Sequence, residues 1–435
     1  MATTELLRPP DGTEPGTPAL GGRLPFPAEF SGPRSVRLAW LATRSAMMLV
    51  LGAVGGPVTG DVLYYGRSMH SLFSGESIRE TLQEYPVPVL GVMLPQYLLG
   101  ALNTVAFAFL FVASMLVVDA AFTALLWRAG GRTRSPAVTF WLWFLPAMGP
   151  IAYFRFDLVP AVLAGAALLL AARRPGWTGA LTGLGVGLKL WPAVMLPVFL
   201  IRRSGRRAVF GWFAATGVVL AGASLAVGGA SRLISPLHWQ AARGLQIESL
   251  PATPLMLARA VHSHHVWAIR TSTYKATEMF GAGVHAMLLV STVATGAGLL
   301  VLAWLWLRAW AIRDVPPVTL GWLILAAAGI ATITNRTLSP QYVLWLGGPE
   351  AALAVFAPHD AAVRRAVRVL LLVAVLTQFI YPIGYAKLVN VGWYTFPMTL
   401  LLAVRNSVLV WLTCLACAQV WRLTTRAVST KPTGP

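Results

Sequence analysis

Apolar stretches separated by short polar loops make up most of the chain. A helix that crosses a bilayer needs about 20 predominantly apolar residues, and stretches of about this length recur along the sequence. The pattern predicts an all-α polytopic integral membrane protein with about ten full spans. We place these spans near residues 38–58, 97–127, 137–151, 158–172, 208–229, 284–307, 318–334, 340–357, 366–383 and 394–420.

One further apolar stretch, 177–201, is interrupted near its middle. It reads WTGALTGLGVGLKLWPAVMLPVFLI and contains Gly187, Lys189 and Pro192. Gly and Pro weaken a helix, and a lysine inside the bilayer is costly. The stretch predicts either one kinked span or a re-entrant hairpin of two half-helices that returns to the side from which it came.

The composition supports a membrane protein. Apolar residues make up 57% of the chain and charged residues only 11%, whereas a soluble protein carries about a quarter. An ordinary soluble enzyme and a disordered chain are therefore excluded. The net charge is +19, from 34 basic and 15 acidic residues. In a soluble protein this would suggest a nucleic-acid partner, but in a membrane protein basic cytoplasmic loops produce it as well.

The positions of the basic residues decide between these interpretations. If the N-terminus is cytoplasmic and 177–201 is a hairpin, about two thirds of Lys and Arg fall on the cytoplasmic side, as the positive-inside rule requires. We therefore favour the hairpin, with about twelve membrane-embedded segments and both termini in the cytoplasm. No nucleic-acid partner is expected. The segments that share this side are RAGGRTR, RRPGW, RRSGRR, RAWAIR, RRAVR and WRLTTR.

Three regions are expected along the chain. Residues 1–36 are rich in Pro and Gly without an apolar core, which predicts a disordered cytoplasmic tail rather than a cleavable signal peptide. Residues 37–422 form the transmembrane domain, with extracytoplasmic loops 59–96 and 230–283. Residues 423–435 form a second cytoplasmic tail. Cys414 and Cys417 lie one helical turn apart in the last span and are expected to pack there rather than bind a metal.

Polar groups kept at membrane level are expensive and mark candidate functional sites. With this topology they gather at the outer face. A cation at the tip of the predicted hairpin could snorkel to the interface or bind an anion such as a phosphate. Buried Asp119 is expected to pair with Arg128 or a neighbouring loop arginine. The outer-face polar residues are Asp61, Arg155, Asp157, Lys189, His238, Arg243, Gln246, Glu248, Arg336 and Lys387.

Asp61 follows the first span and precedes VLYYGRSMHSLFSG, a segment with the spacing of a short interfacial helix. Asp is favoured as the N-cap of such a helix. The same carboxylate could be a general base held at the membrane surface, and the two roles are compatible. The HSHH sequence at 262–265 lacks a Cys or carboxylate at ligand spacing, so a polar loop is expected there and no metal site.

The outer-face motifs together resemble glycosyltransferase family 87. They are GDVLYY, EYPVPVLGVMLP, FRFD, LTGLGVGLKLWPAVMLPVFLIRR, HWQAARGLQIESL and TNRTLSPQYVLWL. The resemblance covers roughly residues 38–420, and YPVP at 85–88 departs from it, because YPP is expected there. Characterised members of the family include the polyprenyl-phosphate-mannose-dependent α-mannosyltransferases of actinobacteria. The resemblance implies the GT-C fold, an extracytoplasmic active site, Asp61 as catalytic base and a lipid-phosphate donor such as polyprenyl-phosphate mannose.

The residues themselves suit this chemistry. A lipid-linked donor fits an active site outside the cytoplasm, where nucleotide sugars are absent. A phosphate monoester leaves without a proton, so one carboxylate base would suffice for an inverting transfer, without any cofactor or metal. Cations would offset the charge that grows on the phosphate. The donor-phosphate candidates are Lys189, Arg155 and Arg336. The sugar and acceptor candidates are His238, Arg243, Gln246, Glu248, Asn335, Gln341 and Tyr342.

Other functions remain open at this stage. The first is a transferase that uses another polyprenyl-phosphate sugar, such as arabinofuranose. The second is a transporter or flippase of lipid-linked sugars, although transporters place substrate groups near the bilayer midplane between structural repeats, and no repeat is visible here. The sequence contains no P-loop, GxSxG or HExxH motif, which argues against nucleotide-driven transport. The favoured function is a multi-pass cell-membrane hexosyltransferase with a lipid or glycan acceptor.

Overall fold

The structure is a computed structural model, and it describes residues 30, 32–131, 135–261 and 266–429. Most of the predicted tail 1–36 and residues 430–435 lie outside this part. The first helix already begins at Pro33, and the last continues to Ser429, seven residues into the predicted second tail. The helices up to residue 242 are α1 (Pro33–Phe73), α2 (Pro88–Leu99), α3 (Thr104–Ala129), α4 (Pro136–Met148), α5 (Ile151–Phe154), α6 (Leu158–Leu170), α7 (Pro175–Leu188), η2 (Trp191–Val194), α8 (Met195–Leu200) and α9 (Arg206–Ala242).

The chain then forms a small cap and a second set of helices. A three-stranded antiparallel sheet has the order β1-β3-β2, so the predicted loop 230–283 is partly a sheet, which the all-α prediction did not include. The elements are β1 (Leu245–Gln246), α10 (Thr253–Val261), β2 (Trp267–Thr271), β3 (Thr277–Gly281), α11 (Val284–Trp310), α12 (Pro317–Ile333), η3 (Pro340–Val343), α13 (Leu344–Phe356), α14 (Ala361–Gln378), η4 (Phe379–Ile383), α15 (Tyr385–Val389) and α16 (Thr395–Ser429).

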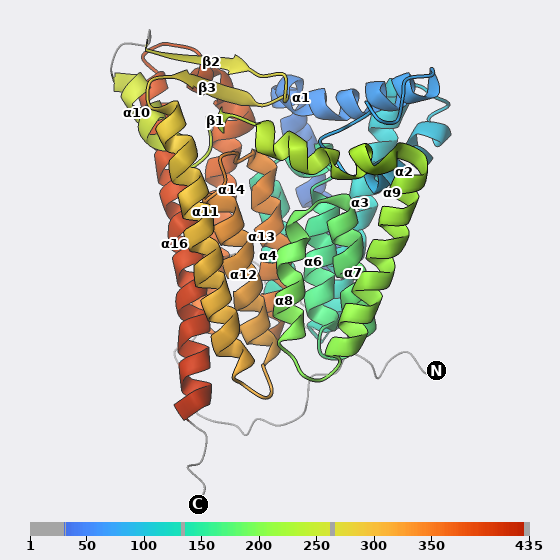
Figure 1. The fold of residues 1–435 in the computed structure, drawn as a ribbon, viewed down its shortest axis with the longest axis vertical. Coiled ribbons are helices and arrows are strands. Elements are labelled where there is room, and N and C mark those ends of the chain that lie inside the picture. The colour runs from blue at the N-terminus through green and yellow to red at the C-terminus, as the bar shows by residue number, and fades with distance from the viewer. Residues whose placement is uncertain (1–29, 31, 132–134, 262–265, 430–435) are drawn as a thin grey trace, which may run out of the picture.

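The helices form a bundle with two classes of member (Figure 1). Among the described residues, five helical segments are long and apolar enough to cross a membrane: Thr104–Ala129, Arg206–Ala242, Val284–Trp310, Ala361–Ile383 and Thr395–Ala427. The second and third of these expose apolar side chains almost all round, as expected against lipid. By contrast, α4, α12 and α13 are shorter and bury most of their residues at the centre.

Close contact between central helices depends on glycine. A Cβ atom on Gly348 of α13 would lie 1.9 Å from the carbonyl oxygen of Ala161 on α6. A Cβ atom on Gly179 of α7 would lie 2.1 Å from the carbonyl oxygen of Val209 on α9. Small residues let helix backbones approach in this way, which is how helices associate where lipid removes the hydrophobic drive.

The stretch 177–201 folds back on itself. α7 ends at Leu188, Lys189 is extended, and η2 and α8 continue in a second arm. The two arms return to the same end of the bundle, because a Cβ atom on Gly205 would lie 2.7 Å from the Cβ of Pro175. The hairpin arrangement therefore describes this segment, and a single kinked span does not.

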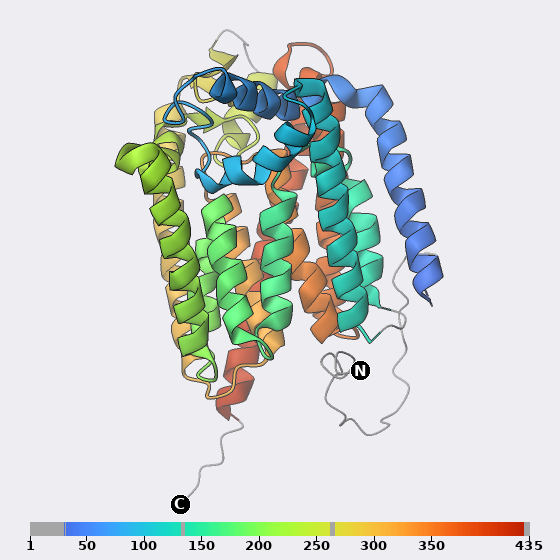
Figure 2. The same cartoon turned by 90° about the vertical axis from the view of Figure 1, so that its right-hand side faces the viewer.

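Two predicted spans continue as helix beyond their expected ends. α1 includes the span 38–58 and runs on to Phe73, and α9 includes 208–229 and runs on to Ala242. The later part of each turns and lies across one end of the bundle (Figure 2). In α9 the turn falls at Gly229, whose φ of 75° and ψ of 179° are not helical. In α1 it is expected at the Gly-Gly-Pro run 55–57, the usual cause of a sharp bend.

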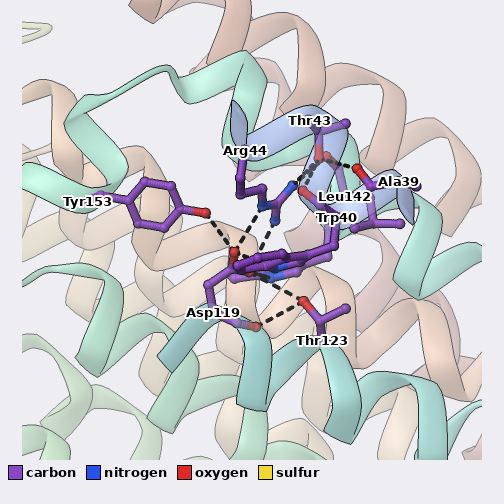
Figure 3. Close-up of polar contacts among 9 residues, drawn as sticks. Ala39, Trp40, Thr43, Arg44, Asp119, Thr123, Leu142 and Tyr153 are labelled. Carbon is purple, nitrogen blue, oxygen red and sulfur yellow. Dashed lines mark hydrogen bonds and ion pairs between the residues drawn. The ribbon is translucent and has the colours of Figure 1, made fainter. Parts of the chain in front are cut away.

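A buried ion pair joins α1 to α3 inside the bundle (Figure 3). Asp119 pairs with Arg44, with Nε–Oδ2 at 2.9 Å, so the expected partner Arg128 was wrong. Both side chains are almost completely buried. The carboxylate also accepts hydrogen bonds from Trp40 at 2.8 Å, Trp141 at 2.7 Å and Tyr153 at 2.6 Å. These donors come from α1, α4 and α5, so one carboxylate fixes four helices relative to one another.

Candidate active site

A cavity of about 820 Å³ lies at the end of the bundle that carries the sheet and the later part of α1. Its walls come from segments that are far apart in the sequence: α1, the α5–α6 and α7–η2 junctions, the end of α9, the sheet, the end of α12 and η3. Nine of the eleven sequence-predicted site residues line it: Asp61, Arg155, Lys189, Arg243, Gln246, Glu248, Asn335, Gln341 and Tyr342.

The other two predicted residues lie elsewhere. His238 is exposed on α9 and is not among the lining residues of the cavity. Arg336 lines a neighbouring groove, and its guanidinium donates to the Ala241 carbonyl at 3.5 Å and to Thr292 Oγ1 at 3.4 Å. Neither residue faces the cavity that collects the rest.

Asp61 lies on the part of α1 that crosses the end of the bundle. It is inside a helix whose N-cap is Gly32, so the prediction that Asp61 caps a new helix was wrong. The first span does not end before Asp61, because the chain bends without losing its helical hydrogen bonds. The carboxylate forms an ion pair with Arg155, and its side chain is 38% exposed, whereas Arg155 is largely buried.

Lys189 occupies a cage at the tip of the hairpin. Its Nζ lies 2.7 Å from Oδ1 of Asp157, which also accepts a hydrogen bond from Trp345 at 2.8 Å. Cation–π contacts of this kind stabilise an ammonium that has left water. Lys189 is thus paired rather than snorkelling into solvent. The four rings around it, at 5.1 to 5.5 Å, are those of Tyr85, Phe156, Tyr342 and Trp345.

Glu248 is a buried carboxyl on the cavity wall, in the segment after β1. Its relative exposure is 1%, and Arg405 donates to its Oε2 at 3.3 Å. Burial raises the pKa of Glu248 to about 7, against the opposing charge of Arg405. Oε1 has no hydrogen-bond partner among the described residues. The residue can therefore offer a polar oxygen to a ligand.

The amide and phenol side chains divide into supports and free groups. Gln246 Oε1 accepts from the backbone N–H of Leu338 at 2.5 Å, and Asn335 Oδ1 accepts from the N–H of Thr337 at 3.0 Å. These two shape the walls. Gln341 has an unpartnered Oε1 within the described residues, and Tyr342 stacks on Trp345 with ring centroids 3.9 Å apart.

Several lining residues were not among the predicted site residues. Tyr64 of α1 donates to Oε1 of Glu84 at 2.9 Å, and Lys275 from the β2–β3 turn lies over the Tyr64 ring. Burial lowers the pKa of Lys275, while Glu84 and Glu76 oppose this shift. The EYPVP motif was the available signal for Glu84 and Tyr85. Nothing near Lys275 in the sequence indicates that the turn reaches α1.

Comparison with known families matches residues 84–340 to glycosyltransferase family 87. The chain belongs to glycosyltransferase family 87. No curated protein and no solved structure matches the chain. The matched range includes Arg155, Lys189 and Glu248, while Asp61 and Gln341 lie outside it. This protein is accordingly a membrane glycosyltransferase, and its cavity can be considered in that light.

The cavity of this family 87 protein is built for a polar ligand. Buried polar atoms without a partner among the described residues gather on its walls, and such atoms are rare in native proteins unless a ligand or water satisfies them. They belong to Glu84, Arg155, Trp191, Arg243, Glu248 and Gln341. Both donors and acceptors are present, which suits the hydroxyl groups of a sugar.

The charge of the lining favours an anion. Five lining side chains are basic: Arg67, Arg155, Lys189, Arg243 and Lys275. Three are carboxylic: Asp61, Glu84 and Glu248. Within the described residues no group of three His, Cys, Asp or Glu side chains could hold a metal. The HSHH sequence at 262–265 lies outside the described residues, so its interpretation as a polar loop stays a prediction.

Proposed function

We propose that this chain transfers a hexose, with mannose as the first sugar to test, from a polyprenyl-phosphate donor to a hydroxyl of a lipid or glycan. The observation that carries the proposal is the set of unpartnered buried donors and acceptors around the cavity, together with its surplus of cations. A sugar supplies the hydroxyls and a phosphate supplies the negative charge. Family membership supports glycosyl transfer.

In the proposed step Asp61 is the general base. It takes the proton of the acceptor hydroxyl while the acceptor oxygen forms a bond to the anomeric carbon. The bond between that carbon and the phosphate oxygen breaks, and its electron pair leaves with the polyprenyl phosphate. Attack from the face opposite the leaving group inverts the configuration. The ion pair with Arg155 would orient the carboxylate at the cavity wall.

Cations on the opposite walls would stabilise the leaving phosphate. Arg155 and Lys189 are proposed for this role because both line the cavity and are fixed in place by carboxylates. A second set would bind the hydroxyls of sugar and acceptor. In this set Glu248, Gln341 and Arg243 offer free polar atoms, while Asn335, Gln246 and Tyr342 shape the walls.

We further propose a GT-C type fold whose cavity faces the outside of the cell. The basic loops at the opposite end support this sidedness. Arg206 at the start of α9 lies over the ring of Trp310 at the end of α11, and Arg308 lies over the ring of Trp421 near the end of α16. Basic residues far apart in sequence therefore gather at one end. Residues 37–422 would be the transmembrane domain, with loops 59–96 and 230–283 outside.

The proposal is tested by transfer of labelled mannose from polyprenyl-phosphate mannose to lipid acceptors in membranes that contain the full chain. Asp61→Asn keeps the shape of the side chain but removes the base, and should lower kcat by ~10²–10⁴-fold. Asp314→Asn is the matched control, because Asp314 is exposed in the α11–α12 loop outside the cavity. Equal activity of Asp61→Asn and the parent protein would rule out Asp61 as base.

The same assay identifies the sugar. Polyprenyl-phosphate arabinofuranose is supplied in parallel, and the donor with the higher kcat/KM defines the natural class. Absence of transfer from any lipid-phosphate sugar by the parent protein would overturn the proposed donor chemistry.

A further inference from the structure

A second hollow of about 370 Å³ lies between α11 and α12, directly beside the cavity. The two hollows share Ala331 and Asn335 in their walls. We refer to the second as the α11–α12 groove. Its lining residues are Val194, Ser291, Thr292, Thr295, Leu299, Leu302, Ala327, Ile330, Ala331, Thr334, Asn335 and Arg336.

The groove changes from polar to apolar along its length. α11 begins and α12 ends at the cavity, so low numbers on α11 and high numbers on α12 lie nearest to it. Hydroxyl groups occupy that end, where Ser291 Oγ donates to the Thr334 carbonyl at 2.6 Å. Away from the cavity the lining consists of Leu299, Leu302, Ala327 and Ile330. An amphipathic molecule would lie in this groove with its polar end toward the cavity.

The groove is accessible from the surface that lipid would cover. Leu299 is 52% exposed although it lines the groove. The two helices touch closely at one point, since a Cβ atom on Gly298 would lie 2.4 Å from Cγ2 of Ile330. A hydrocarbon chain can therefore rest along the seam between α11 and α12 without crossing the bundle.

Arg336 lies at the cavity end of the groove. Its hydrogen bonds to Ala241 and Thr292 are long, at 3.5 and 3.4 Å. Unlike Arg155 and Lys189, it forms no ion pair with any carboxylate in the part of the chain that the structure describes. Its guanidinium is therefore available to an anion at the point where groove and cavity meet.

We propose that the α11–α12 groove holds the hydrocarbon chain of the lipid-phosphate donor, with Arg336 at the donor phosphate; this rests on the proposed function. In the donor the phosphate connects the transferred sugar directly to the hydrocarbon chain. A groove that begins at a cation on the cavity wall matches that order of groups. A glycolipid acceptor has its headgroup between the reacting hydroxyl and its own phosphate, which requires more distance between cation and cavity.

Another groove at the bundle surface fits the donor less well. It measures about 550 Å³ between the end of α1, α2 and α9, and it is lined by apolar side chains apart from Ser224. None of its lining residues also lines the cavity, and none is charged. It lacks both the cation and the shared wall that connect the α11–α12 groove to the proposed reaction.

The test compares two tryptophan substitutions on neighbouring residues of α11. Leu299→Trp fills the groove, whereas Leu300→Trp lies outside it on a residue that is 74% exposed. With a full-length polyprenyl donor, Leu299→Trp should raise KM by about tenfold, because it displaces a few methylene groups that would otherwise be buried. With a ten-carbon donor analogue its KM should stay within about twofold of the parent value, since a short chain makes few contacts in the groove. Arg336→Gln should raise KM for both donors.

Three results would overturn the proposal. They are equal effects of Leu299→Trp and Leu300→Trp on donor KM, the same effect on long and short donors, and a change confined to the acceptor KM. A binding experiment separates this failure from failure of the proposed function. A polyprenyl phosphate with a photoreactive chain and no sugar should crosslink to α11 and α12 in the parent protein, and less in Leu299→Trp. Crosslinks confined to other helices would reject the groove, whatever the activity.

Discussion

The side chains around the cavity differ in how their charges are balanced. Arg155 is paired with Asp61 and Lys189 with Asp157, so each cation reaches the cavity together with a carboxylate. An unpaired charge that is removed from water costs several kcal/mol, and pairing offsets much of this cost. Such pairs can exist in an empty cavity and still present their remaining donors to a phosphate.

Glu248 gives a prediction that depends on pH. Its pKa of about 7 lies above the 4.5 of a free carboxyl, so between these values the native state holds a proton that the unfolded state has released. This contribution is fully present below pH 4.5 and is lost as the pH rises to about 7, amounting to about 3 kcal/mol. Glu248→Gln cannot titrate and should flatten this part of the stability curve.

The measurement is thermal unfolding of the purified protein in detergent at several values from pH 5 to pH 8. Glu80→Gln is the control, because Glu80 is exposed in the segment before α2 and should leave the pH dependence unchanged. If Glu248→Gln keeps the full pH dependence of the parent, another group is responsible for it.

Sequence reasoning located residues better than it located their partners. Asp61 and Lys189 were placed at the cavity end from span boundaries alone, and both line the cavity. By contrast, the partner of Asp119 is Arg44, which is 75 residues away in the chain, and the predicted Arg128 was only nearby in sequence. Hydropathy reports where a helix lies in the bilayer, but not how it is rotated or which neighbour it faces.

At the scale of elements, the hydrophobic pattern predicted helices well and their ends poorly. α9 extends 13 residues beyond its predicted end at 229, because Gly229 bends the chain without ending the helix. The small sheet was missed because β1 has only two residues and its partner β3 is separated from it by α10. Strands this short leave no alternation in the sequence.

The bend in α9 has a measurable function in the fold. Gly229 has a backbone conformation that L-residues avoid, so Gly229→Ala should destabilise the protein by ~1–3 kcal/mol. Beyond the bend, Arg232 donates to the carbonyls of Ile78, Thr81 and Tyr85 and so fixes the segment that carries Glu84. Transfer activity should fall as well.

Gly217→Ala is the matched control for this bend. A Cβ atom on Gly217 of the straight part of α9 would meet no atom within 4 Å. Since alanine favours helix, this variant should be as stable as the parent protein or more stable. If both variants unfold at the same temperature, the conformation of Gly229 is not required.

At the scale of the whole molecule, the burial of the helices is graded from the centre outward. α12 and α13 are almost fully buried, whereas only 11% of the apolar window of α11 is buried. An exposed apolar surface of this extent requires lipid around it. The cavity lies at one end of this arrangement and the basic loops at the other, which makes the proposed sidedness testable.

Cysteine labelling tests that sidedness. The native Cys414 and Cys417 are first replaced by alanine. A single cysteine at Ser204, exposed in the loop after α8, should react only when a membrane-impermeant reagent reaches the cytoplasmic side. A single cysteine at Thr273, exposed in the β2–β3 turn, should react from outside intact cells. The reverse pattern would invert the topology and place the cavity in the cytoplasm.

The cage around Lys189 also sets an order of events during synthesis. Tyr85, Phe156 and Asp157 precede the lysine in the chain, so a counter-ion and two rings exist before the hairpin is made. Trp345 emerges from the ribosome only after 156 further residues, which takes roughly 10–30 s at typical bacterial rates. During that interval the hairpin tip holds its ammonium against Asp157 with half of the cage missing. The insertion machinery therefore has to shelter this turn until the later helices arrive.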